Sequence, residues 1–408
     1  MNANSQSSFY GLGLAPGLLS IIEKLKFTTP TPIQHKAIPP ALEGKDIIGI
    51  AQTGTGKTMA FGLPMIQRLA QIKGKGLVVV PTRELALQVD EALRKFVIPS
   101  GIRTAVLIGG ASMFHQLQSL RRAPRIIVAT PGRLIDHLQQ RNLVLNDVAI
   151  LVLDEADRML DMGFAPQINQ ILQHVSKERQ TMLFSATMPN EIVGLARSYM
   201  KLPLQVEIAP TGTAAEKVVQ EVYIVQRDGK VKLLGFLLTQ YHGTVLVFSR
   251  TKRGATRLTR DLKAMGYSAA EIHSDRSLFQ RKEALEGFKS GKYRILVATD
   301  IAARGIDVSG IELVLNYDLP EDPDNYVHRI GRTARAGKEG RAISFATPDQ
   351  GKDIKDIERL IRTVLPIAKH AELAAESFYQ SAAAAPKRYG SHWRDRGKSS
   401  FGARRRRH

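Results

Sequence analysis

Short runs of β-branched and other apolar residues alternate with amphipathic stretches along most of the chain. Helical patterns such as Glu84–Phe96, Lys252–Met265 and Gln280–Lys289 separate these runs. Continuous apolar strands between helices are typical of parallel sheets that are buried on both faces. The pattern therefore predicts an α/β protein whose parallel sheets are flanked by helices. The expected strands are Asp46–Ile50, Leu77–Val80, Thr104–Ile108, Ile126–Ala129, Ile150–Leu153, Thr181–Phe184, Val219–Val225, Thr244–Phe248, Ala269–Ile272, Arg294–Ala298, Leu313–Tyr317 and Ala342–Ala346.

The chain divides into two expected domains and a tail. Its 408 residues fit two or three domains of ordinary size. The segment 209–216, APTGTAAE, interrupts the strand rhythm and is the expected linker between domains at 1–208 and 217–366. After residue 366 the strand signal stops. The Gly-, Ser- and Arg-rich segment 367–408 is therefore expected to be disordered until it binds a partner.

The charge of the chain predicts an anionic partner. There are 58 Lys and Arg against 38 Asp and Glu, which gives a net charge of +20. The last 42 residues alone hold ten basic and three acidic groups. Such a dense basic tail is typical of segments that bind polyanions, although a solubility role stays open.

Two absences from the sequence narrow the class of protein. The chain has no cysteine, which excludes a disulfide scaffold, a zinc finger, an iron–sulfur cluster and a thiol nucleophile. No apolar run is long enough to span a membrane. A cytoplasmic protein without a membrane partner is therefore expected.

Residues 51–58, AQTGTGKT, follow an expected strand and precede an apolar helical pattern. A glycine-rich loop in this setting lets backbone N–H groups surround phosphates, and the next helix adds its positive N-terminal end. Lys57 would reach the β and γ phosphates of a nucleotide, and Thr58 would ligate magnesium. Ala51 stands where such loops usually have Gly. The expected nucleotide-binding residues of the loop are Thr53, Gly54, Thr55, Gly56, Lys57 and Thr58.

Acidic residues end another apolar strand, at Asp154-Glu155-Ala156-Asp157. Ligands of parallel α/β sheets bind outside the carboxyl ends of the strands. Asp154 would hold magnesium, through water, and Glu155 would orient and deprotonate an attacking water. A solvated acidic loop is the alternative for this segment alone. The phosphate loop upstream favours a nucleoside triphosphatase site.

Further motifs stand in a fixed order along the chain. They are KFTTPTPIQ at 26–34 with Phe9 upstream, PTREL at 81–85, Gly109-Gly110, TPGR at 130–133, DEAD at 154–157, SAT at 185–187, VFSRT at 247–251, ATDIAARGID at 298–307 and HRIGRTARAG at 328–337. This set resembles the DEAD-box family of ATP-dependent RNA helicases, most closely the bacterial RhlE-type subgroup, over about residues 9–366. The resemblance implies two tandem RecA-like domains that use ATP and Mg²⁺ and bind single-stranded RNA.

The resemblance also implies roles for single residues around the nucleotide. Phe27 would stack on adenine and Gln34 would bond the edge of the base; a core aromatic and a helix-start residue are the alternatives. Arg332 and Arg335 share one face of a helical turn and would reach the γ-phosphate as fingers. Asp307 would accept a ribose hydroxyl. The residues implied to couple the two domains are Asp157, Ser185, Thr187, Arg304 and His328.

RNA contacts are implied in both domains. Small polar groups, glycine backbones and arginines bind phosphate and sugar, so the binding would be largely independent of sequence. For any single threonine a helix cap or a turn is an open alternative. The implied RNA-binding residues are Arg83, Gly110, Thr130, Arg133, Thr251, Arg281 and Thr299.

Three positions depart from the family pattern. Lys26 and Ala334 each replace a Gly, and Leu278 stands where a glutamine is common. The leading hypothesis is an RNA-stimulated ATPase that binds single-stranded RNA between its domains and locally unwinds short duplexes. An ATP-dependent RNA clamp or remodelling scaffold that does not unwind is one alternative, and a DNA translocase is another.

Overall fold

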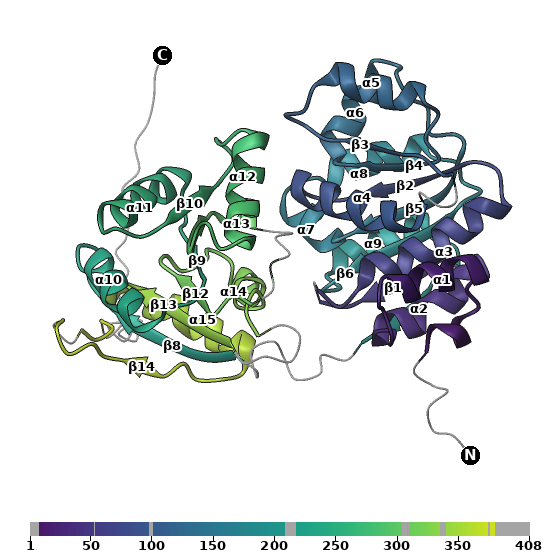
Figure 1. The fold of residues 1–408 in the computed structure, drawn as a ribbon. Helices are drawn as coiled ribbons and strands as arrows, with labels where there is room; N and C mark the ends of the chain where they lie inside the picture. The colour runs from purple at the N-terminus through teal and green to yellow at the C-terminus, as the bar shows by residue number, and fades with distance from the viewer. Residues whose placement is uncertain are drawn as a thin grey trace, which may run out of the picture.

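The computed structural model describes residues 8–52, 54–97, 101–208, 218–303, 308, 310–334, 340–373 and 376–379. Two α/β domains, each built on a seven-stranded parallel sheet, make up this part of the chain (Figure 1). The expectation of parallel sheets flanked by helices is therefore confirmed. The expected linker 209–216 and residues 380–408 of the expected tail lie outside the described residues.

The first domain carries its sheet in the order β3-β4-β2-β5-β6-β1-β7. Among its N-terminal helices, α2 packs near the β7 edge of that sheet, where it contacts α3, β1 and β7, and α1 contacts α4. The elements are η2 (Phe9–Leu12), α1 (Pro16–Lys24), α2 (Pro32–Leu42), β1 (Ile47–Ile50), α3 (Lys57–Gln71), β2 (Lys75–Val79), α4 (Arg83–Val97), β3 (Thr104–Leu107), α5 (Met113–Arg121), β4 (Ile126–Ala129), α6 (Pro131–Gln139), β5 (Val148–Asp154), α7 (Ala156–Asp161), α8 (Ala165–His174), β6 (Gln180–Ser185), α9 (Asn190–Tyr199) and β7 (Leu204–Glu207).

The second domain repeats this plan with the strand order β10-β11-β9-β12-β13-β8-β14. Its elements are β8 (Val218–Ile224), α10 (Lys230–Gln240), β9 (Val245–Phe248), α11 (Lys252–Ala264), β10 (Ala269–Ile272), α12 (Leu278–Lys289), β11 (Ile295–Ala298), α13 (Asp300–Ala303), β12 (Leu313–Asn316), α14 (Pro323–Ile330), β13 (Gly340–Ala346), η4 (Pro348–Gln350), α15 (Gly351–Ile361) and β14 (Ile367–Ala368). Adding seven to each strand number of the first sheet gives the order of the second.

All twelve expected strands are present, and each sheet has one more that sequence patterning missed. The two additional strands, β7 and β14, occupy the same edge of their sheets. β7 is largely exposed and β14 is only two residues long, so neither has the continuous apolar run of a buried strand. β14 also lies inside the segment 367–408, so the second sheet extends beyond the expected boundary at residue 366.

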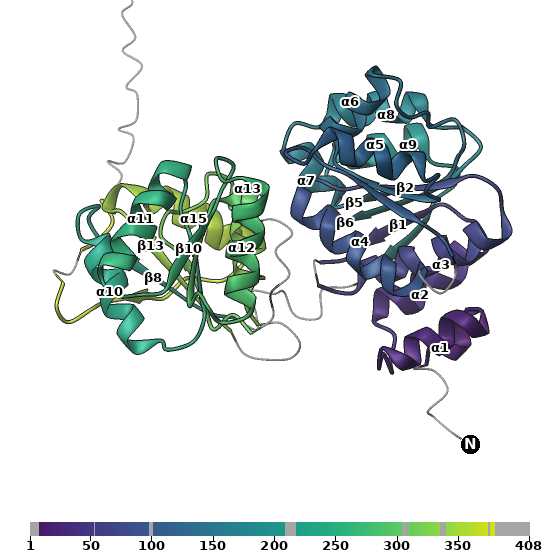
Figure 2. The same ribbon diagram turned by 45° about the horizontal axis from the view of Figure 1, so that its top comes forward.

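Successive residues of the central strands enter opposite cores, because strand side chains alternate between the two faces of a sheet. In β2, Val78 joins the core formed with α2, α3 and α4. Its neighbours Leu77 and Val79 join the core formed with α6, α7, α8 and α9. Figure 2 shows the strands of the first sheet between these two layers.

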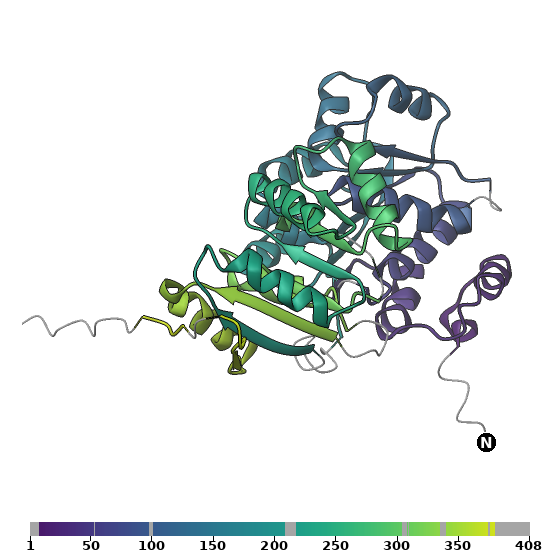
Figure 3. The ribbon, with the colours of Figure 1, turned by 60° about the vertical axis from the view of Figure 1, so that its left-hand side comes forward.

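The second sheet is buried in the same way, by α10 and α11 on one face and by α12, α14 and α15 on the other. The purple N-terminal helices and the yellow end of the second domain lie on opposite sides of the molecule (Figure 3). In both domains the strands are parallel, so the loops at their carboxyl ends gather along one edge, and most of the motifs stand at these strand ends. The motif at 26–34 precedes β1 instead, and the one that begins at His328 lies at the end of α14.

Candidate active site

The glycine-rich loop lies between β1 and the first turn of α3. Lys57 begins α3 and is buried, and its Nζ donates a hydrogen bond across the loop to the carbonyl oxygen of Ala51, 2.9 Å away. Gly56 is the N-cap of this helix and has a φ of 89°. A side chain there would also collide with the Gln34 amide, since a Cβ would lie 2.4 Å from its Nε2. Both constraints require glycine at this position.

Gln34 ties the segment ahead of β1 to the phosphate loop. Its Nε2 donates to the carbonyl oxygen of Gly56 at 3.1 Å, and its Oε1 accepts from the backbone N–H of Thr31 at 2.9 Å. The second bond belongs to a capping box that starts α2, as the helix-start alternative anticipates. Phe27 is 43% exposed, so it is not a core aromatic and its ring can meet a base.

The two catalytic candidates of the DEAD segment, Asp154 and Glu155, are both buried at the end of β5, but their pKa values shift in opposite directions. Burial raises the pKa of Asp154 to about 6, although the ammonium of Lys57 opposes that shift. Burial also disfavours ionised Glu155, but the cations of Arg158, Lys57 and Arg332 outweigh it and lower the pKa of Glu155 to about 2. Glu155 therefore stays ionised, whereas Asp154 holds its negative charge at a cost.

Arg158 fixes the position of Glu155. Its Nη1 forms an ion pair with Glu155 Oε2 at 2.8 Å, and both side chains are almost fully buried. Glu155 also has a φ of 54°, a left-handed conformation that a residue other than glycine adopts at a cost. The short helix α7 thus presents a strained, tightly held carboxylate at the edge of the sheet.

Asp157 joins the DEAD segment to the SAT segment. One of its carboxylate oxygens accepts hydrogen bonds from the backbone N–H groups of Ala186 and Thr187, at 3.0 and 2.9 Å, and from the Thr187 hydroxyl at 3.0 Å. The backbone N–H of Asp157 donates to Ser185 Oγ at 3.3 Å. The structure therefore brings together three of the residues that the sequence implied for coupling between domains.

A chain of side-chain and backbone contacts crosses from the first domain to the second at this point. Arg158 Nη2 lies 3.2 Å from Nδ1 of His328 on α14. Burial and the nearby Arg158 cation lower the pKa of His328 to about 4, so the imidazole is neutral and its Nδ1 accepts the bond. The His328 carbonyl oxygen accepts from Arg332 Nε at 3.3 Å. Arg332 is itself buried.

The implied RNA residues of the first domain gather at the carboxyl ends of β2, β3 and β4. Arg83 begins α4, and its guanidinium lies against Gly110, where an added Cβ would be 2.3 Å from Nη1. Thr130 is the N-cap of α6. Arg133, in the same helix, donates through Nη1 to the Ala111 carbonyl oxygen at 3.2 Å.

In the second domain the equivalent strand ends carry Thr251, Thr299 and the start of α12. Thr251 caps α11, and its Oγ1 accepts a hydrogen bond from the backbone N–H of Gly254 at 3.0 Å. The backbone N–H of Thr299 donates to the carbonyl oxygen of Ile272 at 3.3 Å. Arg281 instead forms a buried ion pair with Glu84 of the first domain, with Nη2 and Oε2 2.6 Å apart. The structure thus brings an implied RNA residue into a contact between the domains.

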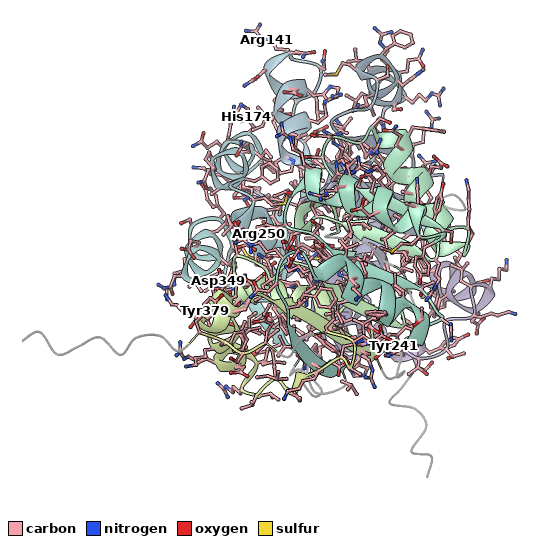
Figure 4. All side chains as sticks on the ribbon, turned by 90° about the vertical axis from the view of Figure 1, so that its left-hand side faces the viewer. Arg141, His174, Tyr241, Arg250, Asp349 and Tyr379 are labelled. Atoms are coloured by element: carbon pink, nitrogen blue, oxygen red, sulfur yellow. The ribbon has the colours of Figure 1, made fainter. Side chains whose placement is uncertain are left out.

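The second domain has its own cleft at the place that the phosphate loop occupies in the first. It has a volume of about 590 Å³ at the carboxyl ends of β8, β9, β12 and β13. Lys230 begins α10 there, as Lys57 begins α3. Lys230 Nζ forms an ion pair with Asp318 at 3.0 Å and donates to the Tyr317 carbonyl oxygen at 2.7 Å. Arg250 and Asp349, labelled in Figure 4, line the same cleft.

Family models match both halves of the chain. A DEAD/DEAH box helicase model matches residues 31–194, and a helicase conserved C-terminal domain model matches residues 229–337. The ATP-dependent RNA helicase CshA of Listeria monocytogenes is 46% identical over 355 residues, which cover 86% of this chain and 68% of that protein. The ATP-dependent rRNA helicase RRP3 of Meyerozyma guilliermondii is 44% identical over 90% of this chain and 78% of that protein. This chain belongs to the DEAD-box family of ATP-dependent RNA helicases.

Solved structures of other DEAD-box proteins share the tandem RecA-like fold of this helicase. Mss116p bound to single-stranded RNA and AMP-PNP has a TM-score of 0.82 at 30% identity, covering 90% of this chain and 78% of that one. S. cerevisiae Dbp5 bound to RNA and ADP BeF3 has a TM-score of 0.78 at 31% identity, covering 88% of this chain and 95% of that one. Within the described residues, no helix of this helicase is long and apolar enough to cross a membrane.

The departures of this helicase from the family pattern have structural consequences. Lys26 and Ala334 have φ values of 60° and 54°, so each adopts the left-handed conformation that glycine favours. For other residues that conformation costs roughly 1–2 kcal/mol. Leu278 packs against the apolar core of the first domain. An apolar contact between domains therefore stands where the family commonly has a glutamine.

Sequence interpretation missed several residues of the site. Arg158 carried one signal, because a residue three positions after Glu155 shares its helix face. Glu84 stands in the PTREL motif, but nothing in the sequence signalled its pairing with Arg281, which is 197 positions away. Thr53, Arg304, Asp307 and Arg335 lie outside the described residues.

Proposed function

We propose that this helicase binds single-stranded RNA along the carboxyl edges of both sheets, closes on ATP and locally separates short duplexes. The observation that carries this proposal is the chain from Glu155 through Arg158 and His328 to Arg332. It links the proposed base in one domain to the proposed finger in the other. Hydrolysis would then depend on how the domains sit, and RNA bound to both domains would bias that arrangement.

At the nucleotide, the residues of the first domain would bind and orient ATP. Lys57 and the backbone of the phosphate loop would hold the phosphates, with the N-terminal end of α3 behind them. Phe27 would stack on the adenine, and Gln34 would connect the base to the loop through its bond to Gly56. An occupied base site would thereby restrain the glycine that caps α3.

The residues present fit a magnesium ion. Within the described ranges no cluster of three or more His, Cys, Asp or Glu side chains could hold a metal. Magnesium commonly uses one or two protein ligands together with phosphates. Thr58 and Asp154 would supply these ligands, and a cation beside Asp154 would relieve the burial that raises its pKa to about 6. When bound, Mg²⁺ neutralises charge on the β and γ phosphates.

For the chemical step, Glu155 would orient the attacking water and take its proton. Arg332 would meet the charge that spreads over the γ-phosphate oxygens. Asp157 of α7 accepts hydrogen bonds from the backbone of the SAT segment, so a movement of that segment after phosphate release would also displace α7. The matching roles of Arg335, Arg304, Asp307 and Thr53 rest on the family pattern alone.

RNA would compete for Arg281. The buried ion pair with Glu84 occupies this guanidinium, and a phosphate oxygen could replace the carboxylate there. Arg83, Gly110, Thr130 and Arg133 would position the strand on the first domain, and Thr251 and Thr299 on the second. Contacts of this kind hold phosphate and sugar, so base sequence would matter little.

Two finer assignments rest on the sequence alone. We place the chain nearest the bacterial RhlE-type subgroup on its motif spellings, although the relatives named above are CshA and RRP3 proteins. We also place it in the cytoplasm, because a cysteine-free chain fits a reducing compartment.

The test is strand displacement. A short RNA duplex with a single-stranded extension is incubated with the protein and either ATP or AMP-PNP. In a third reaction a matched DNA duplex replaces the RNA duplex. Release of the short strand with ATP and RNA supports the proposal. ATP-dependent retention of RNA without strand release would favour the clamp alternative. Equal stimulation of ATP hydrolysis by DNA would favour the translocase.

A further inference from the structure

A basic groove runs along α11 of the second domain, outside the nucleotide site and the cleft at Lys230. It has a volume of about 550 Å³ and lies between α11 and the loop that follows β10. The helix α11 packs against the strand β10 itself. Lys252, Arg253, Arg257 and Arg260 line it from the helix, and Arg276 and Asp275 line it from the loop.

The periodicity of α11 explains why its cations face outward. Ala255, Leu258 and Leu262 are buried against the sheet, which leaves the basic residues on the opposite face. Arg253, Arg257 and Arg260 then recur about once per helical turn, roughly 5.4 Å apart along the axis. A regular row of cations matches a ligand whose charges also repeat, and a nucleic acid backbone is such a ligand.

The neighbouring carboxylates leave most of the charge on α11 available, whereas Arg276 of the loop is paired with the largely buried Glu271. The side chains of Arg257 and Arg260 are 78% and 76% exposed, and both lie near Asp261 at distances of 4.0 and 3.8 Å. Lys252 pairs with Asp275 at 2.7 Å, with both side chains about half exposed. Exposed pairs of this kind stabilise a protein little, so an incoming phosphate can replace the carboxylate.

The groove continues the edge of the sheet that carries the proposed RNA contacts. Thr251 is the N-cap of α11 and directly precedes the first cation of the groove. The loop at 273–276 follows β10, and β10 has the sheet position that β3 has in the first domain. β3 leads to Gly109-Gly110, so equivalent strand ends bear the RNA segment in one domain and the groove in the other. His273 joins the loop to the helix, with Nε2 3.1 Å from Thr256 Oγ1.

We propose that the α11 groove binds the RNA backbone outside the segment held between the two domains. The proposal rests on the RNA helicase activity of the family but concerns residues that none of its motifs includes. The groove would bind any sequence, because guanidinium groups on phosphates read no bases. Its effect would be to raise affinity for long RNA and to keep a substrate attached while the core opens.

The first experiment measures RNA affinity against salt for an Arg257→Glu/Arg260→Glu variant. Each phosphate neutralised on a single strand contributes about −0.7 to the slope of log K against log salt. Losing two contacts should flatten the slope by about 1.4. If the variant and wild type bind equally at 1 M salt, the variant should then bind roughly 25-fold more weakly than wild type at 0.1 M salt. The difference should shrink as the RNA is shortened.

The control is Lys355→Glu/Arg359→Glu, which makes the same charge change on the exposed face of α15 in the same domain. Its slope should stay within about 0.3 of wild type, well below the change expected for two lost contacts. Equal slopes for the groove variant and wild type at every RNA length would overturn the proposal. An equal loss in the α15 control would do the same, because it would show a general charge effect.

The second experiment uses the absence of cysteine from the chain. Arg260→Cys then carries the only thiol, to which a photocrosslinker is attached, with Arg359→Cys as the control. Crosslinks to RNA from position 260 but not from 359 support the site, and arms with and without a duplex show which form occupies it. No RNA crosslink from 260, in a preparation whose ATPase is still stimulated by RNA, refutes the groove without refuting the helicase.

Discussion

The two domains share one strand order but have opposite electrostatics at equivalent strand ends. In the first, burial raises the pKa of Asp154, where β5 ends. In the second, burial also works to raise the pKa of Asp318, just beyond β12, but Lys230 overcomes it and the pKa is lowered. Lys230 neutralises a carboxylate of its own domain, whereas Lys57 bonds a backbone carbonyl.

This difference teaches what a nucleotide site requires beyond its fold. The scaffold places a lysine at a helix N-terminus and carboxylates at a strand end in both domains. The glycine loop stands in the first domain, and of the two strand ends compared, the one at Asp154 keeps a burial cost that a ligand could relieve. In the second cleft the charges of Lys230 and Asp318 already neutralise each other, so this lysine is not left free for the phosphates of a nucleotide.

The largest expected effect removes the proposed base. Glu155→Gln keeps the shape and the bond to water but cannot take a proton, so steady-state ATPase should fall by up to about 10⁴-fold. ATP and RNA binding should persist. The matched change in the other domain, Asp318→Asn, should leave turnover within about threefold of wild type. Similar losses in both variants would erase the distinction between the domains.

Removing the proposed finger should have the next largest effect. Arg332→Ala should lower kcat in saturating RNA by about a thousandfold, because the finger favours the transition state. Nucleotide affinity should change far less, which a direct binding titration would measure. An unchanged kcat would contradict the finger role of Arg332.

The pH dependence of unfolding separates the two strand ends by sign. The pKa of Asp154 rises from 3.8 to about 6 on folding, so its stability contribution is present below pH 3.8 and is lost as pH rises through 6. Without ligands, Asp154→Asn should therefore stabilise the protein above pH 6, by about 3 kcal/mol.

Asp318→Asn should do the reverse. Its pKa is lowered on folding, so the carboxylate stabilises at neutral pH and that contribution is lost as pH falls. The variant should be destabilised at pH 7 and approach wild type in acid. Urea unfolding of both variants between about pH 2 and 8 checks the pair, because the Asp318 contribution is lost only below pH 3.8. Effects of the same sign at neutral pH would break the comparison.

A smaller effect is expected at the contact between the domains. Glu84→Gln removes the charge that competes with RNA phosphate for Arg281, so RNA affinity should rise three- to tenfold, about 1 kcal/mol. Glu91→Gln, on an exposed position of the same helix, is the control. Weaker RNA binding by Glu84→Gln would mean that the ion pair helps to hold the binding form.

The smallest effect concerns backbone strain. Each domain has one residue with a left-handed backbone conformation at a position where the family pattern has glycine. Lys26→Gly and Ala334→Gly should each stabilise the chain by about 1 kcal/mol, because both sites have positive φ. Lys355→Gly, inside α15, should destabilise by a similar amount. Thermal unfolding of the three variants measures this, and destabilisation by Ala334→Gly would contradict the strain argument.

The sequence determined the fold class and the central strands, because a strand buried on both faces must be apolar throughout. It also placed the phosphate loop and the DEAD carboxylates, since short-range spacing alone brings a glycine loop to the start of a helix and acids to the end of a strand. The apolar pattern did not predict the edge strands β7 and β14, because partly exposed strands are not apolar throughout.

Only the tertiary structure decided which charges meet. The pairs Glu84–Arg281 and Arg158–His328 join residues more than 150 positions apart, and no local pattern encodes such contacts. The opposite pKa shifts of Asp154 and Asp318 also depend on burial and on a lysine from another element. Electrostatic energy varies with distance and desolvation, and both are fixed only when separate segments pack together.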